Sequence, residues 1–236
     1  MLSISNPEKP EVLAAERDYL VIYKPPKMHS APLAKSSGEN VLSFCIESFP
    51  EIKALDGLRE GEGGLLHRLD YETHGLLLVA RNQKSLDALL ARQREGLFKK
   101  EYSAIASETR TALPGFPPAN ADSALSALKS AFRPYGPGRK AVRPLVANTG
   151  MQYVTEVLNE SVTDKGFLSL RLRILNGFRH QLRCHLAWIG KPILNDALYG
   201  GLSFGKGFLA LRACSLSFID PASGRELVFS IPDLPH

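Results

Sequence analysis

The segment with the most reactive side chains is His67–Leu78, which reads HRLDYETHGLLL. One of its two carboxylates, Asp70, stands in a polar stretch between two apolar runs, Gly64–Leu69 and Gly75–Arg81. We interpret both runs as buried strands, and loops between such strands often hold catalytic side chains. A carboxylate in that place can attack a substrate as a nucleophile or assist the departure of a leaving group.

Two later segments offer partners for such a carboxylate. The first is Lys100–Tyr102, reading KEY, which supplies an aromatic ring at Tyr102. The second is Gly177–Ile193, reading GFRHQLRCHLAWIGKPI, which supplies Arg183 and continues to D-x-x-Y-G at residues 196–200. Taken singly, these residues have ordinary structural interpretations: a turn aspartate, a half-buried strand tyrosine and an arginine in a surface salt bridge.

Several common catalytic signatures are absent from the sequence. It contains no G-x-x-x-x-G-K-[ST], G-x-G-x-x-G, H-E-x-x-H or G-x-S-x-G pattern, so the chain lacks the usual marks of nucleotide hydrolysis, dinucleotide redox chemistry, zinc proteolysis and α/β-hydrolase chemistry. His180 and His185 share a predicted helix, but a spacing of five residues turns them apart, so one capping and one packed or hydrogen-bonded histidine is favoured over a metal pair. We expect neither a metal nor another cofactor.

The three segments together resemble the RluA-type pseudouridine synthases, which isomerise uridine to pseudouridine in structured RNA. The early strand Tyr19–Pro26, ending in Lys-Pro, also resembles that family. The resemblance implies that Asp70 is the catalytic nucleophile, that Tyr102 packs against the target base and that Arg183 pairs with the catalytic carboxylate. It also implies the pseudouridine synthase fold with its catalytic cleft.

Some positions depart from the family pattern. His74 stands where serine is usual, Phe178-Arg179 where Arg-Thr is usual, and Asn195 where glycine is common. None of these changes removes a group to which the resemblance gives a catalytic role.

The distribution of charge agrees with an RNA substrate. The net charge is +5, but the stretch from Lys129 to Arg183 holds ten Lys/Arg against three Asp/Glu. A local basic excess is what a polyanion requires, and a target base stacked in RNA must be flipped out at a cost that phosphate contacts offset. The residues that we expect to contact RNA are Arg68, Arg179, His180, Arg171, Arg173 and Lys140.

The elements that must position these residues are mainly strands. Apolar alternation and turn residues predict strands over 12–15, 19–23, 99–107, 151–158, 167–175, 208–218 and 226–231. Helical spacing predicts helices over 38–49, behind possible caps at Ser36 and Ser37, over about 82–95 with Asn82 as cap, and over 180–189. Strands outnumber helices without sustained βαβ alternation, so we expect an α+β fold with a mixed, mostly antiparallel central sheet and flanking helices.

The stretch of about 113–146 differs from the rest in composition. Six prolines and three glycines predict an irregular insertion with at most one short helix near 123–132. With this insertion, the length of 236 residues fits a single catalytic domain over 1–236, and we expect no separate N-terminal RNA-binding module.

The three cysteines, Cys45, Cys184 and Cys214, are far apart and odd in number, which favours reduced thiols in a cytoplasmic protein. No apolar run is long enough for a membrane span, and we expect a monomer.

The leading hypothesis is therefore a cofactor-independent isomerase that acts on one uridine of rRNA or tRNA. Two alternatives remain open: a catalytically silent RNA-binding protein that retains the fold, and a glycosidase-like hydrolase that uses Asp70. The hydrolase lacks a second carboxylate in a recognisable partner role, since Glu72 has no independent support.

Overall fold

The computed structural model describes residues 8–33, 38–119, 127–146, 150–205 and 207–235. The chain forms two compact units. The first comprises Met1–Lys100 and Arg212–Asp233, and the second comprises Glu101–Leu211 and Leu234–His236.

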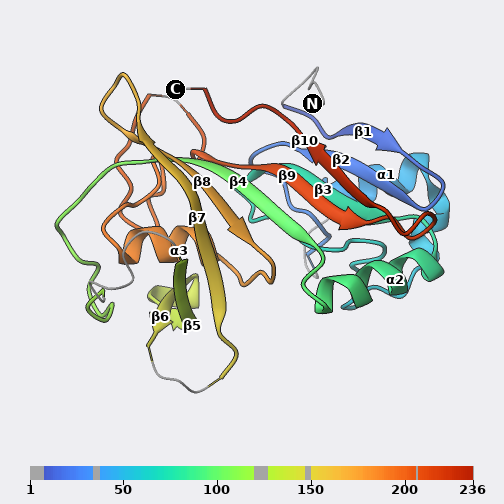
Figure 1. Cartoon of the computed structure of the whole chain (residues 1–236), viewed down its shortest axis with the longest axis horizontal. Helices are drawn as coiled ribbons and strands as arrows, with labels where there is room; N and C mark the ends of the chain where they lie inside the picture. Colours follow the sequence, from blue (N-terminus) through green and yellow to red (C-terminus); the bar gives the residue numbers. More distant parts are fainter. Residues whose placement is uncertain (1–7, 34–37, 120–126, 147–149, 206, 236) are drawn as a thin grey trace. The chain divides into compact units, whose positions relative to one another are not determined.

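The strands of the first unit pair in the order β1-β2-β3-β9, with β10 beside β9 (Figure 1). They are β1 (Glu11–Ala15), β2 (Tyr19–Lys24), β3 (His74–Ala80), β9 (Leu211–Ile219) and β10 (Glu226–Ser230). The β3·β9 pair is parallel, and the other pairs are antiparallel. The strands predicted near the start and the end of the chain are therefore confirmed, and each two form an antiparallel pair.

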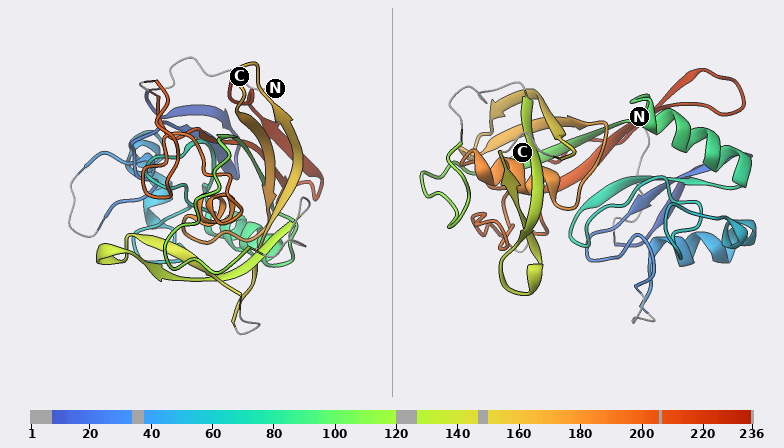
Figure 2. Two further views of the ribbon diagram at one scale, coloured as in Figure 1. Left: turned by 90° about the vertical axis from the view of Figure 1, so that its left-hand side faces the viewer. Right: turned by 90° about the horizontal axis from the view of Figure 1, so that it is seen from below.

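Both faces of the β2·β3 pair are buried, and the two helices of the first unit lie on opposite sides of it (Figure 2). Helix α2 (Gln83–Arg94) packs Leu86, Leu89 and Leu90 into a core cluster with Tyr19, Val21 and Tyr23 of β2. Helix α1 (Val41–Ser48) buries Val41, Leu42 and Cys45 and is followed by the 3-10 helix η1 (Pro50–Ala54). Since successive strand residues point to opposite faces, continuous apolar strands are the expected sequence for a layer covered on both sides.

Asparagine residues cap both helices. Asn82 accepts a hydrogen bond from the Ser85 amide at 2.9 Å, as predicted, and Asn40 accepts one from the Ser43 amide at 2.9 Å. The suggested caps Ser36 and Ser37 lie outside the described residues, and the structure gives the cap of α1 to Asn40.

The prediction of a strand over Gly64–Leu69 is wrong. This run lies against β3 through two backbone hydrogen bonds, Ala80 N to Gly64 O and Leu66 N to Leu78 O, but forms only one isolated bridge, at Leu65. A short apolar run indicates that the segment is buried, but it does not indicate that the backbone forms a continuous β-ladder. Composition therefore could not distinguish this buried connecting segment from a strand.

The second unit has the strand order β4-β8-β7-β5-β6. Its strands are β4 (Lys99–Ala106), which begins in the first unit, β8 (Leu168–Ile174), β7 (Tyr153–Val162), β5 (Ala127–Tyr135) and β6 (Ala141–Leu145). The strands predicted over 151–158 and 167–175 correspond to β7 and β8, which pair antiparallel. The helix itself, α3 (Gln181–Trp188), lies close to β6 and β7 (Figure 1).

The prediction that residues 113–146 are irregular is wrong from Ala127 onward, as is the short helix suggested there. The structure places an antiparallel hairpin, β5·β6, across the 3-10 turn η3 (Pro137–Arg139), and Figure 2 shows its strands, in yellow-green, side by side. Pro144 is compatible with a strand here because β6 stands last in the strand order, and edge strands tolerate proline. Residues 120–126 lie outside the described part.

The described elements are thus mainly strands in a mixed, mostly antiparallel arrangement with three α-helices, which confirms the α+β class. Within the described ranges, no helix is both long and apolar enough to cross a membrane.

Candidate active site

Asp70 lies in a turn whose backbone is held from both sides. The buried Ser30 hydroxyl donates to the Leu69 carbonyl at 3.1 Å and accepts from the Leu69 amide at 3.0 Å, immediately before Asp70. The Thr73 amide then closes the turn by donating to the Asp70 carbonyl at 3.1 Å. The Asp70 backbone is therefore fixed before any substrate binds, while its side chain remains partly exposed.

Lys24, the last residue of β2, is buried beside this turn. Its ammonium donates to the carbonyl oxygens of Pro25, at 2.9 Å, and Tyr71, at 3.2 Å. Burial lowers the pKa of Lys24 to about 7, against the raising effect of the negative charges of Asp70 and Glu72. Lys24 thus holds the backbone of the turn at Tyr71, and its pKa depends on the negative charge of Asp70.

The strand that follows the turn begins at a crowded junction with β9. Gly75 has φ +120°, and a Cβ on it would lie 2.2 Å from the Ala213 carbonyl oxygen, so only glycine fits. His74 accepts a hydrogen bond at Nε2 from Arg212 Nε at 3.1 Å. Burial, with added repulsion from Arg212 and Lys24, lowers the pKa of His74 to about 3, so this imidazole is neutral.

Three buried side-chain polar atoms have no hydrogen-bond partner within the described residues, and all belong to the segment 67–74: His67 Nδ1, Thr73 Oγ1 and His74 Nδ1. Buried polar atoms are nearly always paired in folded proteins, so such atoms mark places where a ligand or an ordered water binds. All three belong to residues within four positions of Asp70 in the sequence.

Arg68, which precedes this turn, is about half exposed, with 49% of its side-chain surface accessible. It forms an ion pair with Glu62 at 3.1 Å. Its position at the surface leaves the guanidinium accessible to a polar ligand.

In the second unit, Arg183 forms a buried, two-point ion pair that sequence reasoning missed. Its Nε and Nη2 donate to Asp196 Oδ2 and Oδ1 at 2.7 and 2.8 Å, and the two side chains are 7% and 0% exposed. This fork geometry fixes the plane of the guanidinium. Asp196 stood in the D-x-x-Y-G motif, but nothing in its spacing from Arg183 identified it as a partner.

Tyr199, from the same motif, connects Arg183 to its surroundings. Its ring centroid lies 5.4 Å from the guanidinium carbon, and its hydroxyl accepts from the Val142 amide at 2.8 Å and donates to the Val142 carbonyl at 3.2 Å. Burial raises the pKa of this hydroxyl, so it stays protonated. The hydroxyl also lies 3.2 Å from His180 Nδ1.

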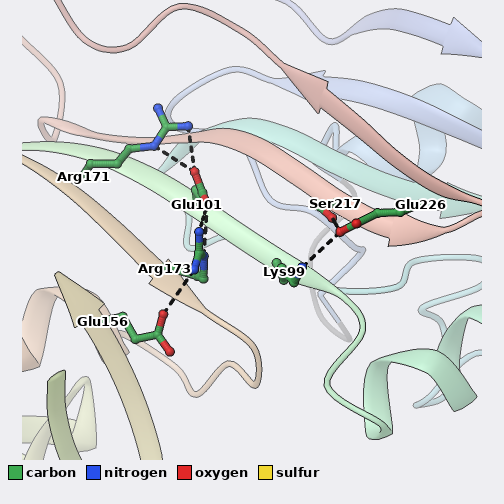
Figure 3. Close-up of polar contacts among 7 residues, drawn as sticks. All are labelled: Lys99, Glu101, Glu156, Arg171, Arg173, Ser217 and Glu226. Atoms are coloured by element: carbon green, nitrogen blue, oxygen red, sulfur yellow. Dashed lines mark hydrogen bonds and ion pairs between the residues drawn. The ribbon is translucent and has the colours of Figure 1, made fainter. Parts of the chain in front are cut away.

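Tyr102 lies on β4 and is 5% exposed. The preceding residue, Glu101, lies between Arg171 and Arg173 of β8 and links β4 to β8 (Figure 3). The Arg171 Nε and Nη2 donate at 3.1 and 2.9 Å, and the Arg173 Nε and Nη2 at 3.0 and 2.7 Å. Although burial raises the pKa of Glu101, the bonds from both arginines outweigh it and leave that pKa below the ordinary value.

The predicted RNA contacts in the second unit differ in their surroundings. Arg171 and Arg173 are ion-paired with Glu101, and Arg173 also lies 3.5 Å from Glu156. Arg179 donates through Nη2 to the carbonyl oxygens of Arg139, at 2.9 Å, and Ala141, at 3.1 Å. These contacts give the three arginines structural partners, and their contacts with RNA stay a prediction.

The two remaining candidates of this unit lie at turns. Lys140 is exposed at the end of the β5–β6 turn. His180 stands at the N-cap position of α3 with φ +56° and makes no capping hydrogen bond with its side chain, contrary to the capping role suggested above.

His185 is hydrogen-bonded in the core, as predicted. Its ring nitrogens lie 2.9 Å from the hydroxyls of Ser130 and Thr155, and burial lowers its pKa to about 3. Across the described ranges, no group of three His, Cys, Asp or Glu side chains is arranged to hold a metal ion.

Figure 3 also shows polar contacts of Glu226, the first residue of β10. Lys99 and Ser217 both donate to Glu226 Oε1, at 3.0 and 2.5 Å, within the first unit. They join the start of β4 to β9 and β10 by side-chain bonds at the surface.

We compared the chain with known protein families, proteins and structures. A family model described as RNA pseudouridylate synthase matches residues 18–188, a stretch that contains Asp70, Tyr102 and Arg183. The chain is 29% identical to "Uncharacterized RNA pseudouridine synthase YjbO" of Bacillus subtilis, over 97% of this chain and 74% of that protein. It is 27% identical to "Ribosomal large subunit pseudouridine synthase D" of Vibrio parahaemolyticus, over 94% of this chain and 66% of that protein.

The solved structures agree on the fold. "Human RNA Pseudouridylate Synthase Domain Containing 1" superimposes with a TM-score of 0.65 at 21% identity, covering 98% of this chain and 86% of that one. "Human RNA Pseudouridylate Synthase Domain Containing 4" gives 0.64 at 18% identity, over 94% and 88%. The resemblance drawn from the sequence is confirmed: the chain belongs to the RNA pseudouridylate synthase family, whose enzymes are intramolecular isomerases.

Proposed function

We propose that this protein converts one uridine of a structured rRNA or tRNA into pseudouridine, with Asp70 as the nucleophile. In this proposal Tyr102 packs against the target base and Arg183 pairs with the Asp70 carboxylate. The two units described above act together as one catalytic domain. The observation that carries the proposal is the family match over residues 18–188, which includes Asp70, Tyr102 and Arg183.

The surroundings of Asp70 support its role. Ser30 and the Thr73 amide fix the backbone on either side, so the backbone that carries the carboxylate needs no rearrangement at the moment of reaction. The unpartnered polar atoms of His67, Thr73 and His74 offer hydrogen bonds to a flipped nucleotide or to water that it retains.

The pairing of Arg183 with Asp196 supports a positioning role for its guanidinium. Asp196 holds the edge formed by Nε and Nη2, which leaves the orientation of Nη1 determined by the same plane. A guanidinium fixed in this way can direct a second carboxylate, and we assign that role to Asp70.

The reaction balances without an added reagent. The bond between ribose C1′ and uracil N1 breaks, the uracil turns within the site, and C1′ bonds to C5. The C5 proton is lost and N1 gains one, so no atom or electron enters or leaves overall. The Asp70 carboxylate either holds the sugar or the ring covalently during the turn or assists departure of the base, and a neutral, enclosed aromatic surface at Tyr102 retains the free uracil.

A stacked target base must leave the helix before it reaches Asp70, at a cost of roughly a few kcal/mol. We propose that contacts with phosphate, sugar and neighbouring bases offset this cost. The side chains that we assign to these contacts are Arg68, Arg179, His180, Arg171, Arg173 and Lys140.

The names of the relatives suggest where to begin the search for the RNA. Vibrio parahaemolyticus and other bacteria supply relatives named for the large ribosomal subunit, so rRNA of that subunit is the first substrate to test and tRNA the second. An RNA substrate of this kind, together with three buried free thiols, agrees with a cytoplasmic monomer, which we also propose.

The competing function is an RNA-binding protein that retains the fold without turnover. Incubation of the purified protein with unmodified rRNA and tRNA separates the two, because only the enzyme forms pseudouridine. Pseudouridine at one defined position, missing in cells that lack the protein, is the result we expect. Salt-sensitive binding to the same RNA without any modified uridine would favour the binding protein, and release of free uracil would favour a hydrolase.

A further inference from the structure

The β5–β6 hairpin, Ala127–Leu145, has charged side chains of positive sign only. Its 19 residues contain five cations and no acidic residue: Lys129, Arg133, Arg139, Lys140 and Arg143. Four of these side chains are exposed and Arg143 is half-buried. Among the residues that the structure describes, none of the five has a carboxylate partner, in contrast to Arg171 and Arg173.

Two of these arginines face each other across the hairpin. The register pairs Arg133 directly with Arg143, so their side chains leave the same face of the strands. Directly opposed side chains lie about 5 Å apart at Cβ, and like charges in this arrangement destabilise the strand pair. Arg143 donates through Nη1 to the carbonyl oxygen of Gly115, which orients it without neutralising its charge.

Contacts between the hairpin and residues near the Arg183 helix stabilise the hairpin against this repulsion. The Tyr199 hydroxyl binds both backbone groups of Val142, and Arg179 donates to carbonyl oxygens at the hairpin turn. Phe132 stacks on Phe178, with ring centroids 5.1 Å apart and planes within 10°. The hairpin is thus a built part of the second unit, and its unneutralised charge is a stable feature of the surface.

We propose that the β5–β6 hairpin binds the phosphate backbone of the RNA substrate, with Arg133 and Arg143 gripping one phosphate between them. Lys129 and the turn residues Arg139 and Lys140 contact neighbouring phosphates. An anion between the two arginines removes their repulsion, which makes phosphate binding more favourable than at separate exposed arginines. The inference rests on the proposed function, since it takes RNA as the ligand.

The sharpest test is Arg133→Glu, because it predicts opposite changes in stability and in binding. A glutamate opposite Arg143 replaces repulsion with attraction, so Tm rises by roughly 1–2 °C. Affinity for RNA falls at least tenfold because a positive contact becomes negative. A lower Tm together with lower affinity would overturn the proposal, since a damaged fold would then explain the loss of binding.

Binding is measured with fluorescently labelled total rRNA and total tRNA at several salt concentrations. In Arg133→Gln/Lys140→Gln the slope of log affinity against log salt decreases by roughly 1–2, as expected for two lost phosphate contacts. The matched control is Lys53→Gln/Lys84→Gln, which removes the same charge from exposed positions of the first unit. Arg133→Lys, which retains the charge, keeps most of the affinity.

Equal affinity and salt slope in the hairpin and control variants would overturn the proposal. Turnover separates this inference from the proposed function. If the wild-type protein forms pseudouridine but the hairpin variants bind normally, only the hairpin assignment fails. If hairpin variants bind RNA weakly but the wild-type protein never modifies uridine, the hairpin assignment stands and the enzymatic function fails.

Discussion

Replacement of the buried Lys24 by methionine changes how the stability of the protein depends on pH. Burial holds the pKa of Lys24 at about 7 in the folded chain, against an ordinary value of 10.5. Below pH 7 folding must therefore bury a charged ammonium. At about 1.4 kcal/mol per pH unit, the cost is roughly 5 kcal/mol, which methionine avoids.

The direction of the pH effect follows from proton binding. Between about pH 7 and 10.5 the unfolded chain holds a proton on Lys24 that the folded chain has released, so wild-type stability rises with pH in this window. Methionine does not bind a proton, so it adds no such dependence on pH. The free energy of unfolding of the wild-type protein, minus that of Lys24→Met, rises by roughly 2 kcal/mol from pH 7 to pH 9.

Urea unfolding at pH 7, 8 and 9 measures this difference, and titration of all other groups cancels between the two proteins. The hydrogen bonds that methionine loses, to Pro25 and Tyr71, shift the difference equally at each pH. Lys84→Met, which removes a lysine from an exposed position on α2, is the matched control. A flat difference for Lys24→Met would refute the reasoning that burial depresses its pKa.

Other substitutions test the contacts that hold the site. Asp196→Asn removes the Asp196 carboxylate charge from beside the buried Arg183 guanidinium and lowers the free energy of unfolding by about 3–5 kcal/mol in urea titrations, whereas exposed Asp164→Asn changes it by less than about 0.5 kcal/mol. Gly75→Ala brings a Cβ to 2.2 Å from the Ala213 carbonyl oxygen and lowers Tm far more than Gly166→Ala, a glycine also at positive φ but in open space. Glu101→Gln is less stable than the wild-type protein at neutral pH, and this gap narrows as the pH falls below 4.5, because the folded-state pKa of Glu101 is depressed; a gap that stays constant in acid denaturation would count against the ion pairs as its cause.

Elements with a clear apolar period could be predicted from the sequence. The alternation of Leu168, Leu170 and Leu172 with Arg171 and Arg173 specified β8 and its buried face, and Asn82 specified the start of α2. The β5–β6 hairpin could not be predicted in this way, because its prolines and glycines resemble a loop. What makes Pro144 acceptable is the place of β6 in the strand order, which local composition does not reveal.

The candidate site could also be predicted only in part. Asp70, Tyr102 and Arg183 could be identified because each lies within a sequence motif. Their supports lie elsewhere in the chain: Ser30 is 39 residues from Leu69, and Glu101 is 70 residues from Arg171. Such partners depend on tertiary packing, so residue types alone gave no means of choosing them.

The central claim is that Asp70 is the nucleophile, and the most direct measurement is pseudouridine formation by Asp70→Asn. This variant keeps the size of the side chain, and the backbone bonds of the turn with Ser30 and Thr73 do not involve the Asp70 carboxylate. We therefore predict a fall in turnover of roughly 10⁴-fold or more, with Tm and RNA affinity close to those of the wild-type protein. Pseudouridine formed by Asp70→Asn at the wild-type rate would contradict the account.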